Sequence, residues 1–244
     1  MILENKVHVL GRKEDIDTVR VPGKVAIVLD VLFATSTIAA ALAHGAAAVI
    51  PALDEAGARE EGKRHVHGTA VLAGELYAET LPGFAPPTPL ALLEHGVAGK
   101  QVIYATTNGT VALRAACGAV HVYAGALLNG RAVVEHVLDA YPDRTILIVC
   151  SGSMGNFNLE DFYGAGYLVE LLAQQLGNRA DLSDAACAAR ALFGAGDPLP
   201  SLIGSRVGRM MAERGLTHEI AYAAQLSALD VVPRLEDGRL IAAR

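Results

Sequence analysis

Three short apolar runs without apolar–polar alternation predict strands that are buried on both faces. They are Val25–Leu29, Gln101–Ala105 and residues 145–150, and each ends in a polar or glycine-containing turn. Such continuous runs are typical of strands that are covered by helices on both sides. Each run precedes an Ala- and Leu-rich segment that predicts a helix, at about 36–44, 109–117 and 159–176. The alternation indicates an α/β fold, layered α/β/α, with a largely parallel or mixed sheet.

Two of these strand–helix units resemble each other. Residues 37–45 and 110–118 have the same length, and each segment leads into an Ala-rich strand, at 46–51 and 119–124. Gly45 and Gly118 are expected just past their helices, where a left-handed C-cap favours glycine. The pattern fits an internal duplication of strand–turn–helix–strand units. It fits equally well two independent units that are both rich in alanine.

The chain has no linker that divides it clearly into domains. Residues 81–92 hold four of the ten prolines and predict a rigid loop, then a helix beginning near Pro89 with Thr88 as its N-cap. A second Gly- and Pro-rich connection, at 194–201, precedes a predicted C-terminal helix. Neither has the composition of a disordered linker. We therefore expect one domain over residues 1–244, within which 1–95 and 96–244 could form two lobes.

Composition excludes two broad classes of protein. Hydrophobic residues make up 52% of the chain and charged residues 19%, which is the reverse of the composition of a disordered protein. The formal net charge is −6, from 20 Lys and Arg against 26 Asp and Glu. Sequence-independent nucleic-acid binding relies on clustered Lys and Arg, so we expect no nucleic-acid partner.

The cysteines and the apolar segments indicate a cytoplasmic protein. The three cysteines, Cys117, Cys150 and Cys187, form no CxxC or zinc spacing and are expected to be reduced thiols. The first residues carry charges throughout and have no apolar leader segment. Polar residues interrupt the longest apolar stretch, 31–50, so we expect no membrane partner. A homodimer is expected by base rate.

Polar side chains and glycines follow each of the three predicted strands. In open α/β sheets, ligands bind at the ends of the strands, and helix N-termini there favour anions. Hydroxyls, an Asn-Gly turn and small residues at these ends could contact phosphate, although each segment could also be an ordinary turn or N-cap. The candidate substrate- and phosphate-binding residues are Thr35, Ser36, Thr37, Thr107, Asn108, Gly109, Thr110, Ser151 and Gly152.

Three carboxylates near the ends of predicted elements suggest a metal site. They are Asp30 after the first strand, Glu75 after the apolar residues 70–73, and Asp161 in the first turn of the helix at 159–176. Mg²⁺ prefers such oxygen ligands, and it can polarise a phosphoryl oxygen. Acids in a first helical turn also stabilise the helix dipole, so Glu160 and Asp161 could be structural. We take Asp30, Glu75 and Asp161 as the candidate catalytic and Mg²⁺-binding residues of a phosphoryl-transfer site.

Histidines and C-terminal arginines give weaker signals. His65 and His67 would share one face of a strand and could bind a metal there, but surface decoration is the more common role. Arg206, Arg209 and Arg214 near the C-terminal helix are expected on its solvated face. No GxSxG nucleophile elbow is present.

Several motifs together resemble the 2-phosphosulfolactate phosphatase family, over nearly the whole chain. They are Asp-Val-Leu-Phe-Ala-Thr-Ser-Thr at 30–37, Gly-Glu at 74–75, Thr-Thr-Asn-Gly-Thr at 106–110, Leu-Asn at 128–129, Leu-Glu-Asp at 159–161 and Ser-Arg-Val-Gly-Arg at 205–209. The resemblance implies a Mg²⁺-dependent acid phosphatase with an α/β fold peculiar to that family. It also implies a small phosphate-ester substrate, 2-phospho-3-sulfolactate, which is a precursor in coenzyme M biosynthesis.

The resemblance also implies roles for particular residues. Asp30, Glu75, Asn108 and Asp161 become the expected metal- or phosphate-facing groups, and Asn129 joins the phosphate-binding candidates. Two family arginines are absent, because Phe33 stands where the first motif normally has Arg, and Leu76 where the second has it. The loop at 85–89 also departs from the usual Gly-Asn-Ser-Pro.

The two absent guanidinium groups predict an altered substrate. Losing a charge-assisted contact to an anion costs about 1.5–3 kcal/mol, so a trianionic substrate should bind poorly. The departures predict a substrate that is less anionic or more apolar, or the loss of phosphatase activity.

Two other interpretations compete with this one. A haloacid-dehalogenase-type phosphatase needs a second Asp two residues after the first, and this chain has Leu32 there. A non-catalytic or repurposed metal- or ligand-binding protein could retain the fold. Phe33 and Leu76 favour that interpretation, whereas the three acids favour an enzyme.

Overall fold

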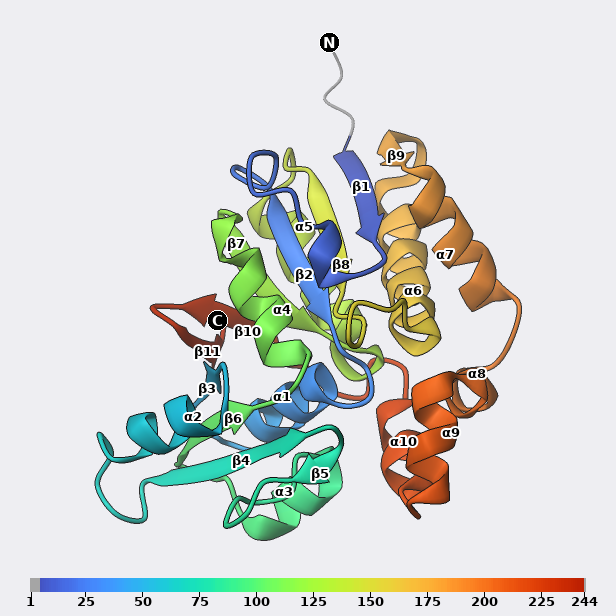
Figure 1. Cartoon of the computed structure of the whole chain (residues 1–244). Helices are drawn as coiled ribbons and strands as arrows, with labels where there is room; N and C mark the ends of the chain where they lie inside the picture. The colour runs from blue at the N-terminus through green and yellow to red at the C-terminus, as the bar shows by residue number, and fades with distance from the viewer. Residues whose placement is uncertain (1–4, 244) are drawn as a thin grey trace.

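A computed structural model describes residues 5–243 (Figure 1). Within this range the strands are β1 (Asn5–Leu10), β2 (Val25–Leu29), β3 (Ala48–Ala52), β4 (Ala70–Leu76), β5 (Glu79–Thr80), β6 (Gln101–Ala105), β7 (His121–Gly125), β8 (Ile146–Cys150), β9 (Ala180–Leu182), β10 (Pro233–Glu236) and β11 (Arg239–Ala242). The α-helices are α1 (Ala34–Ala43), α2 (Glu55–Gly62), α3 (Pro89–His95), α4 (Gly109–Ala115), α5 (Gly130–Ala140), α6 (Leu159–Leu176), α7 (Asp184–Gly194), α8 (Pro198–Gly204), α9 (Arg206–Glu213) and α10 (Thr217–Ala223).

The strands form one mixed sheet in the order β5-β4-β6-β3-β11-β10-β7-β2-β8-β1-β9. Two groups of parallel strands, β4-β6-β3 and β7-β2-β8-β1-β9, lie on either side of the antiparallel hairpin β10–β11. Because β7–β10, β10–β11 and β11–β3 are all antiparallel, the two groups run in opposite senses. The predicted α/β class with a mostly parallel, mixed sheet is confirmed.

The two similar units exchange strands with each other. β2 of the first unit pairs with β7 of the second, while β6 of the second pairs with β3 of the first. The N-termini of α1 and α4 meet between the groups, where a Cβ on Gly109 would lie 2.3 Å from the Cβ of Ala34. This reciprocal pairing is what an internal duplication would produce, although the duplication itself stays a prediction. Strands from both sides of residue 95 alternate in the sheet, so that residue does not separate two groups of strands.

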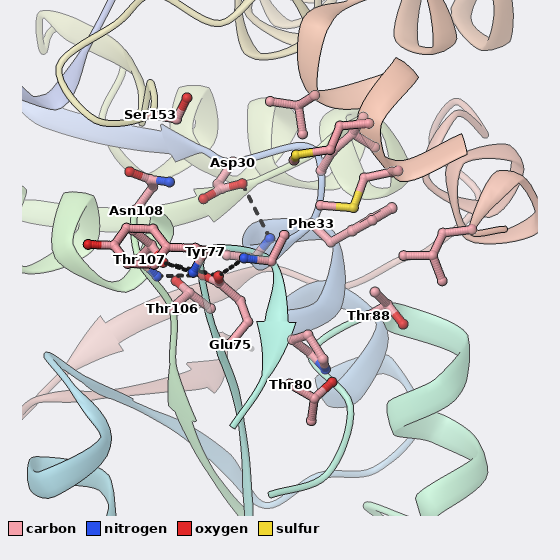
Figure 2. Close-up of a pocket in the computed structure, with 18 of the residues that line it drawn as sticks. Asp30, Phe33, Glu75, Tyr77, Thr80, Thr88, Thr106, Thr107, Asn108 and Ser153 are labelled. Atoms are coloured by element: carbon pink, nitrogen blue, oxygen red, sulfur yellow. Dashed lines mark hydrogen bonds between the residues drawn. The ribbon is translucent and has the colours of Figure 1, made fainter. Parts of the chain in front are cut away.

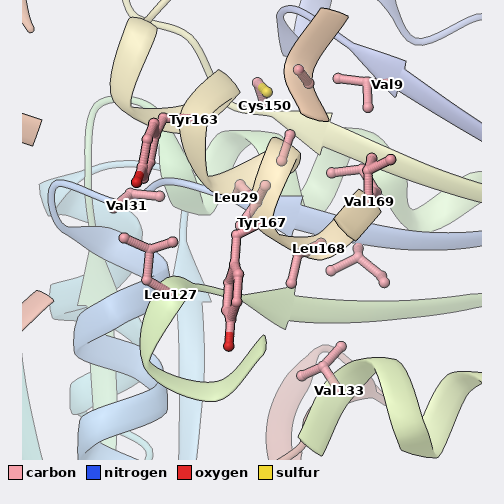
Figure 3. Close-up of a cluster of buried hydrophobic side chains, with 14 of the residues drawn as sticks. Val9, Leu29, Val31, Leu127, Val133, Cys150, Tyr163, Tyr167, Leu168 and Val169 are labelled. Carbon is pink, nitrogen blue, oxygen red and sulfur yellow. The ribbon is translucent and has the colours of Figure 1, made fainter. Parts of the chain in front are cut away.

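Two hydrophobic cores cover the opposite faces of the central strands. Ile27 and Leu29 of β2 pack with α5, α6 and α7, whereas Ala26 and Val28 pack with α1 and α4. Figure 3 shows the first core, in which Tyr167 and Leu168 of α6 lie against β2. Both faces of these strands are therefore buried, which explains the absence of apolar–polar alternation in their sequence.

The predicted boundaries mostly agree with the structure. Val25–Leu29 and Gln101–Ala105 are strands over their whole predicted length, and α3 begins at Pro89 after the extended Thr88. Gly45 has the expected positive φ of 85°. The prediction for Gly118 is wrong, because this residue ends a 3₁₀ turn that continues α4 and its φ is not positive.

Helices α8, α9 and α10 form a group that precedes the hairpin β10–β11 in the chain and lies beside the carboxyl ends of β2 and β4 (Figure 1). Ser205 begins α9 by accepting a hydrogen bond from the Gly208 amide at 2.9 Å. Glu219 of α10 joins this group to α3, because its buried carboxylate accepts hydrogen bonds from Thr88 Oγ1 (2.6 Å) and from the Leu90 and Ala91 amides (2.8 and 2.9 Å). Among the described helices, none is long and apolar enough to cross a membrane.

Candidate active site

A cavity of about 450 Å³ lies where β2, β4 and β6 end. Its polar lining includes Asp30, Glu75, Thr80, Thr88, Thr106, Thr107, Asn108, Ser153, Asn158 and Arg206. Segments far apart in sequence thus meet at the ends of strands in both parallel groups, which is where open α/β sheets bind their ligands. The volume falls in the range of small-molecule sites.

Asp30 lies at the centre of this cavity, directly after β2 (Figure 2). It is 8% exposed, and its Oδ1 accepts a long hydrogen bond of 3.4 Å from the Ala34 amide. Burial raises the pKa of Asp30 to about 7, and the charge of Glu75 adds to this effect. The cavity therefore holds two acids whose negative charges oppose each other.

Glu75 is held in place by the turn that follows β6. Its Oε1 accepts the Thr107 amide at 2.5 Å, and its Oε2 accepts Thr107 Oγ1 at 3.0 Å and the Ala78 amide at 2.7 Å. The Thr107 hydroxyl in turn accepts the Tyr77 amide at 3.1 Å. Thr107 thus fixes the position of this carboxylate, as the dashed lines in Figure 2 show.

Asn108 is positioned by a lysine that the sequence did not single out. Lys13 Nζ donates to Asn108 Oδ1 at 3.3 Å and to the Ser151 carbonyl at 3.1 Å, and its side chain is only 11% exposed. The Met154 amide also points at Asn108 Oδ1, at 3.4 Å. Both donors engage the amide oxygen, so the amide of Asn108 is oriented by the protein.

Arg206 supplies a positive charge to the cavity lining. Its guanidinium donates to Ser153 Oγ and to Asn158 Oδ1, the latter at 3.3 Å. Ser153 also donates to Asn158 Oδ1 at 2.9 Å, which closes a small network around the arginine. Arg206 is exposed, as expected for a solvated helix face, and as the first residue of α9 it also lines the cavity, which the sequence did not indicate.

Asp161 does not share the cavity with the other two predicted acids. It is 1% exposed, and it accepts hydrogen bonds from the Val31 amide (2.9 Å), Ser151 Oγ (3.0 Å) and the Gly152 amide (3.2 Å). These contacts tie the ends of β2 and β8 to α6. Burial and the charge of Asp30 raise the pKa of Asp161. The structure therefore brings Asp30 and Glu75 together in the cavity and places Asp161 outside its lining, where it is hydrogen-bonded to the protein.

Most of the predicted phosphate-binding residues bond to the protein itself. Thr35 Oγ1 bonds to the backbone of Asp30, Ser36 Oγ donates to the Val31 carbonyl, and Thr37 Oγ1 donates to the Pro87 carbonyl. Only Thr107 and Asn108 of that set line the cavity, and those outside the lining are Thr35, Ser36, Thr37, Gly109, Thr110, Asn129, Ser151 and Gly152.

The residues outside the lining form hydrogen bonds with, or pack closely against, neighbouring parts of the protein. Thr110 exchanges hydrogen bonds with Thr106 at the start of α4, while Asn129 bonds to the Ala126 amide and to the Ala124 and Val231 carbonyls. Gly109 permits the close approach of α1 and of Asp30, since a Cβ there would lie 2.3 Å from the Cβ of Ala34 and 2.7 Å from Asp30 Oδ2. The turns after strands thus use their hydroxyls to satisfy buried backbone groups.

Phe33 and Leu76 occupy different environments. Phe33 is 7% exposed and lines the cavity, whereas Leu76 is 51% exposed and lies outside the lining. The Phe33 position thus affects the cavity directly, and the Leu76 position does not.

The residues present fit a divalent cation only in part. Asp30 and Glu75 offer carboxylate oxygens in one cavity, and a cation between them would stabilise the negative charge of Asp30, which burial and, to a lesser extent, Glu75 disfavour. Among residues 5–243, however, no three His, Cys, Asp or Glu side chains form a group that could hold a metal. His65 lies in a turn and bonds to Glu61, not on a strand face.

The fold and this cavity define a small-molecule α/β enzyme site, and comparisons with known proteins identify the family. A family model described as 2-phosphosulpholactate phosphatase matches residues 11–238. A protein of Deinococcus radiodurans named probable 2-phosphosulfolactate phosphatase is 39% identical over 216 residues, covering 88% of each chain. One of Carboxydothermus hydrogenoformans with the same name is 38% identical over 223 residues, covering 89% of this chain and 90% of its own.

The chain belongs to the 2-phosphosulpholactate phosphatase family, and its relatives are named as phosphatases, which are phosphoric monoester hydrolases. The resemblance read from the motifs is thereby confirmed.

Proposed function

We propose that the protein is a Mg²⁺-dependent phosphatase that hydrolyses a small phosphate monoester in the cavity at Asp30 and Glu75. The observation that supports this most is the presence of two carboxylates in one cavity, at the carboxyl ends of β2 and β4. The names of the family and of the relatives, which denote phosphatases, agree with this chemistry.

Asp30 and Glu75 would hold the cation, with water and a phosphate oxygen completing its shell. When bound, Mg²⁺ supplies charge stabilisation to the phosphoryl group. Arg206 would bind a phosphate oxygen from the opposite side, because its planar guanidinium suits that geometry. Thr107 keeps Glu75 in position, and Lys13 keeps Asn108 in position.

The proposed substrate range differs from the one that the relatives' name suggests. Their name refers to 2-phosphosulfolactate, whose ester carries a carboxylate and a sulfonate besides the phosphate. In this cavity Phe33 stands where the family motif has Arg, and Arg206 is the only Lys or Arg among the described lining residues. A less anionic ester would avoid unpaired negative charge here.

The test is phosphate release from a panel of phosphate monoesters by the purified protein, with Mg²⁺ and with EDTA. We expect turnover that needs Mg²⁺ and falls at least 100-fold in Asp30→Asn and Glu75→Gln. Asp139→Asn, at an exposed position on α5, should keep the wild-type rate. Mg²⁺ binding without turnover of any ester would instead support the non-catalytic alternative.

A further inference from the structure

The active-site cavity has two chemically different ends. Its polar end contains Asp30, Glu75, Thr107, Asn108 and Arg206. The opposite side, called here the apolar wall, consists of Phe33, Val207, Met210, Met211 and Leu216. In Figure 2, Asn108, Thr107 and Ser153 lie on one side of Asp30, and Phe33 lies on the other.

The apolar wall is one continuous surface. Phe33, Val207 and Met211 belong to a single buried hydrophobic cluster, and Met210 and Leu216 pack against it. Most of the wall comes from α9 and from the turn that follows it, which Glu219 anchors to α3. Methionine side chains adapt to irregular apolar partners, so this wall can take chains of different shape.

The described lining of the cavity offers one cationic side chain to an anionic substrate. Among the described lining residues, Arg206 is the only Lys or Arg, and it already bonds to Ser153 and Asn158. A second anionic group on the substrate would lie against the apolar wall without a cationic partner. Burying an unpaired charge in this way is strongly unfavourable, whereas burying an alkyl group is favourable.

We propose that the cavity takes a phosphate monoester of an apolar, uncharged alcohol, with the phosphate at the polar end and the organic part on the apolar wall. The inference rests on the proposed phosphatase function for its chemistry. It goes further in naming the class of substrate and in assigning specificity to Phe33 and the α9 methionines.

The test is calorimetric binding of alkylphosphonates. They resemble the substrate but have a P–C bond in place of the P–O–C ester linkage, so a phosphatase does not hydrolyse them. Methyl-, ethyl-, propyl- and butylphosphonate are titrated into the wild-type protein with Mg²⁺ present. Each added methylene should lower Kd roughly fourfold, so that butylphosphonate binds about 60-fold more tightly than methylphosphonate. Phosphonoacetate, which carries a second anionic group, should bind at least tenfold more weakly than propylphosphonate.

Two variants of the apolar wall, and one control outside the cavity lining, test whether this wall causes the dependence of Kd on alkyl length. Phe33→Arg should flatten the series and strengthen phosphonoacetate relative to propylphosphonate. The matched control Leu53→Arg adds the same charge at an exposed position outside the lining, and it should leave the series unchanged. Met210→Lys, at a partly buried position, repeats the test in case Phe33→Arg does not fold.

The outcomes separate this inference from the proposed function. A flat alkyl series in the wild-type protein, or tighter binding of phosphonoacetate than of propylphosphonate, would overturn the apolar substrate class. Absence of turnover with every ester would contradict the phosphatase function alone, because the binding series is measured without hydrolysis.

Discussion

Replacing Asp30 by Asn should abolish activity and at the same time stabilise the metal-free protein at neutral pH. The side chain is buried beside Glu75, so its negative charge is unfavourable in the folded state. Asn has the same shape, and its Oδ1 can still accept the Ala34 amide. The substitution therefore removes the charge and keeps the packing.

The magnitude follows from the pKa of Asp30, which is raised from 3.8 to about 7. Each pKa unit corresponds to about 1.36 kcal/mol, so ionising Asp30 costs the fold about 4 kcal/mol. Because the pKa is raised in the folded state, protonated Asp30 favours folding, and this contribution to the free energy of unfolding is fully present below about pH 4. It is lost as the pH rises through about 7.

Urea unfolding in EDTA, at half-unit steps from pH 4 to 8, measures this difference. We expect the Asp30→Asn variant and the wild-type protein to have similar free energies of unfolding near pH 4. The variant should then gain about 1.4 kcal/mol over wild type per pH unit, levelling off above pH 7 at about 4 kcal/mol.

Asp139→Asn provides the matched control, because Asp139 is exposed on α5. Its stability difference from wild type should stay flat across the same pH range. A difference for Asp30→Asn that is also independent of pH would refute the reasoning, since Asp30 would then ionise as it does in the unfolded chain.

Three further substitutions test the neighbouring contacts, each by urea unfolding at pH 7. Asp161→Ala, measured at pH 4 instead so that the carboxyl is uncharged, should lower the free energy of unfolding by about 1–3 kcal/mol, because the donors at Val31, Ser151 and Gly152 would lose their acceptor; an increase would contradict the importance of these contacts. Gly109→Ala should cost about 1–3 kcal/mol and most of the activity, since the new Cβ would clash with Ala34; a neutral result would refute the close approach of α1 and α4. Glu219→Ala should cost about 3 kcal/mol and raise KM, and an unchanged KM would show that the apolar wall does not depend on this anchor.

The sequence predicted the fold well where strands are buried on both faces. Val25–Leu29 and Gln101–Ala105 carry enough continuous apolar residues to be recognised without further information. It could not predict the hairpin β10–β11 in the middle of the sheet, because that pairing depends on contacts between distant segments. Gly118 shows the local limit, since a 3₁₀ turn replaced the expected left-handed cap.

Four of the residues that the sequence suggests for the site lie together in the cavity lining. They are Asp30, Glu75, Thr107 and Asn108, and their functional roles stay predictions. Asp161 and the hydroxyls of residues 35–37 have the same sequence pattern as the residues of the cavity. In the structure, however, they form hydrogen bonds with buried backbone groups. Arg206 was missed because its helix is brought to the site by long-range packing. A homodimer stays a prediction that light scattering on the purified protein would check.

The location of the catalytic centre is tested most directly by crystals grown with Mn²⁺ in place of Mg²⁺ and with inorganic phosphate. The anomalous signal of Mn²⁺ reports the position of the cation without assumptions about the mechanism. We expect a peak between the carboxylates of Asp30 and Glu75, with phosphate beside it and in reach of Arg206. A peak at Asp161, or a protein that turns over phosphate esters with no cation bound at Asp30 and Glu75, would contradict it.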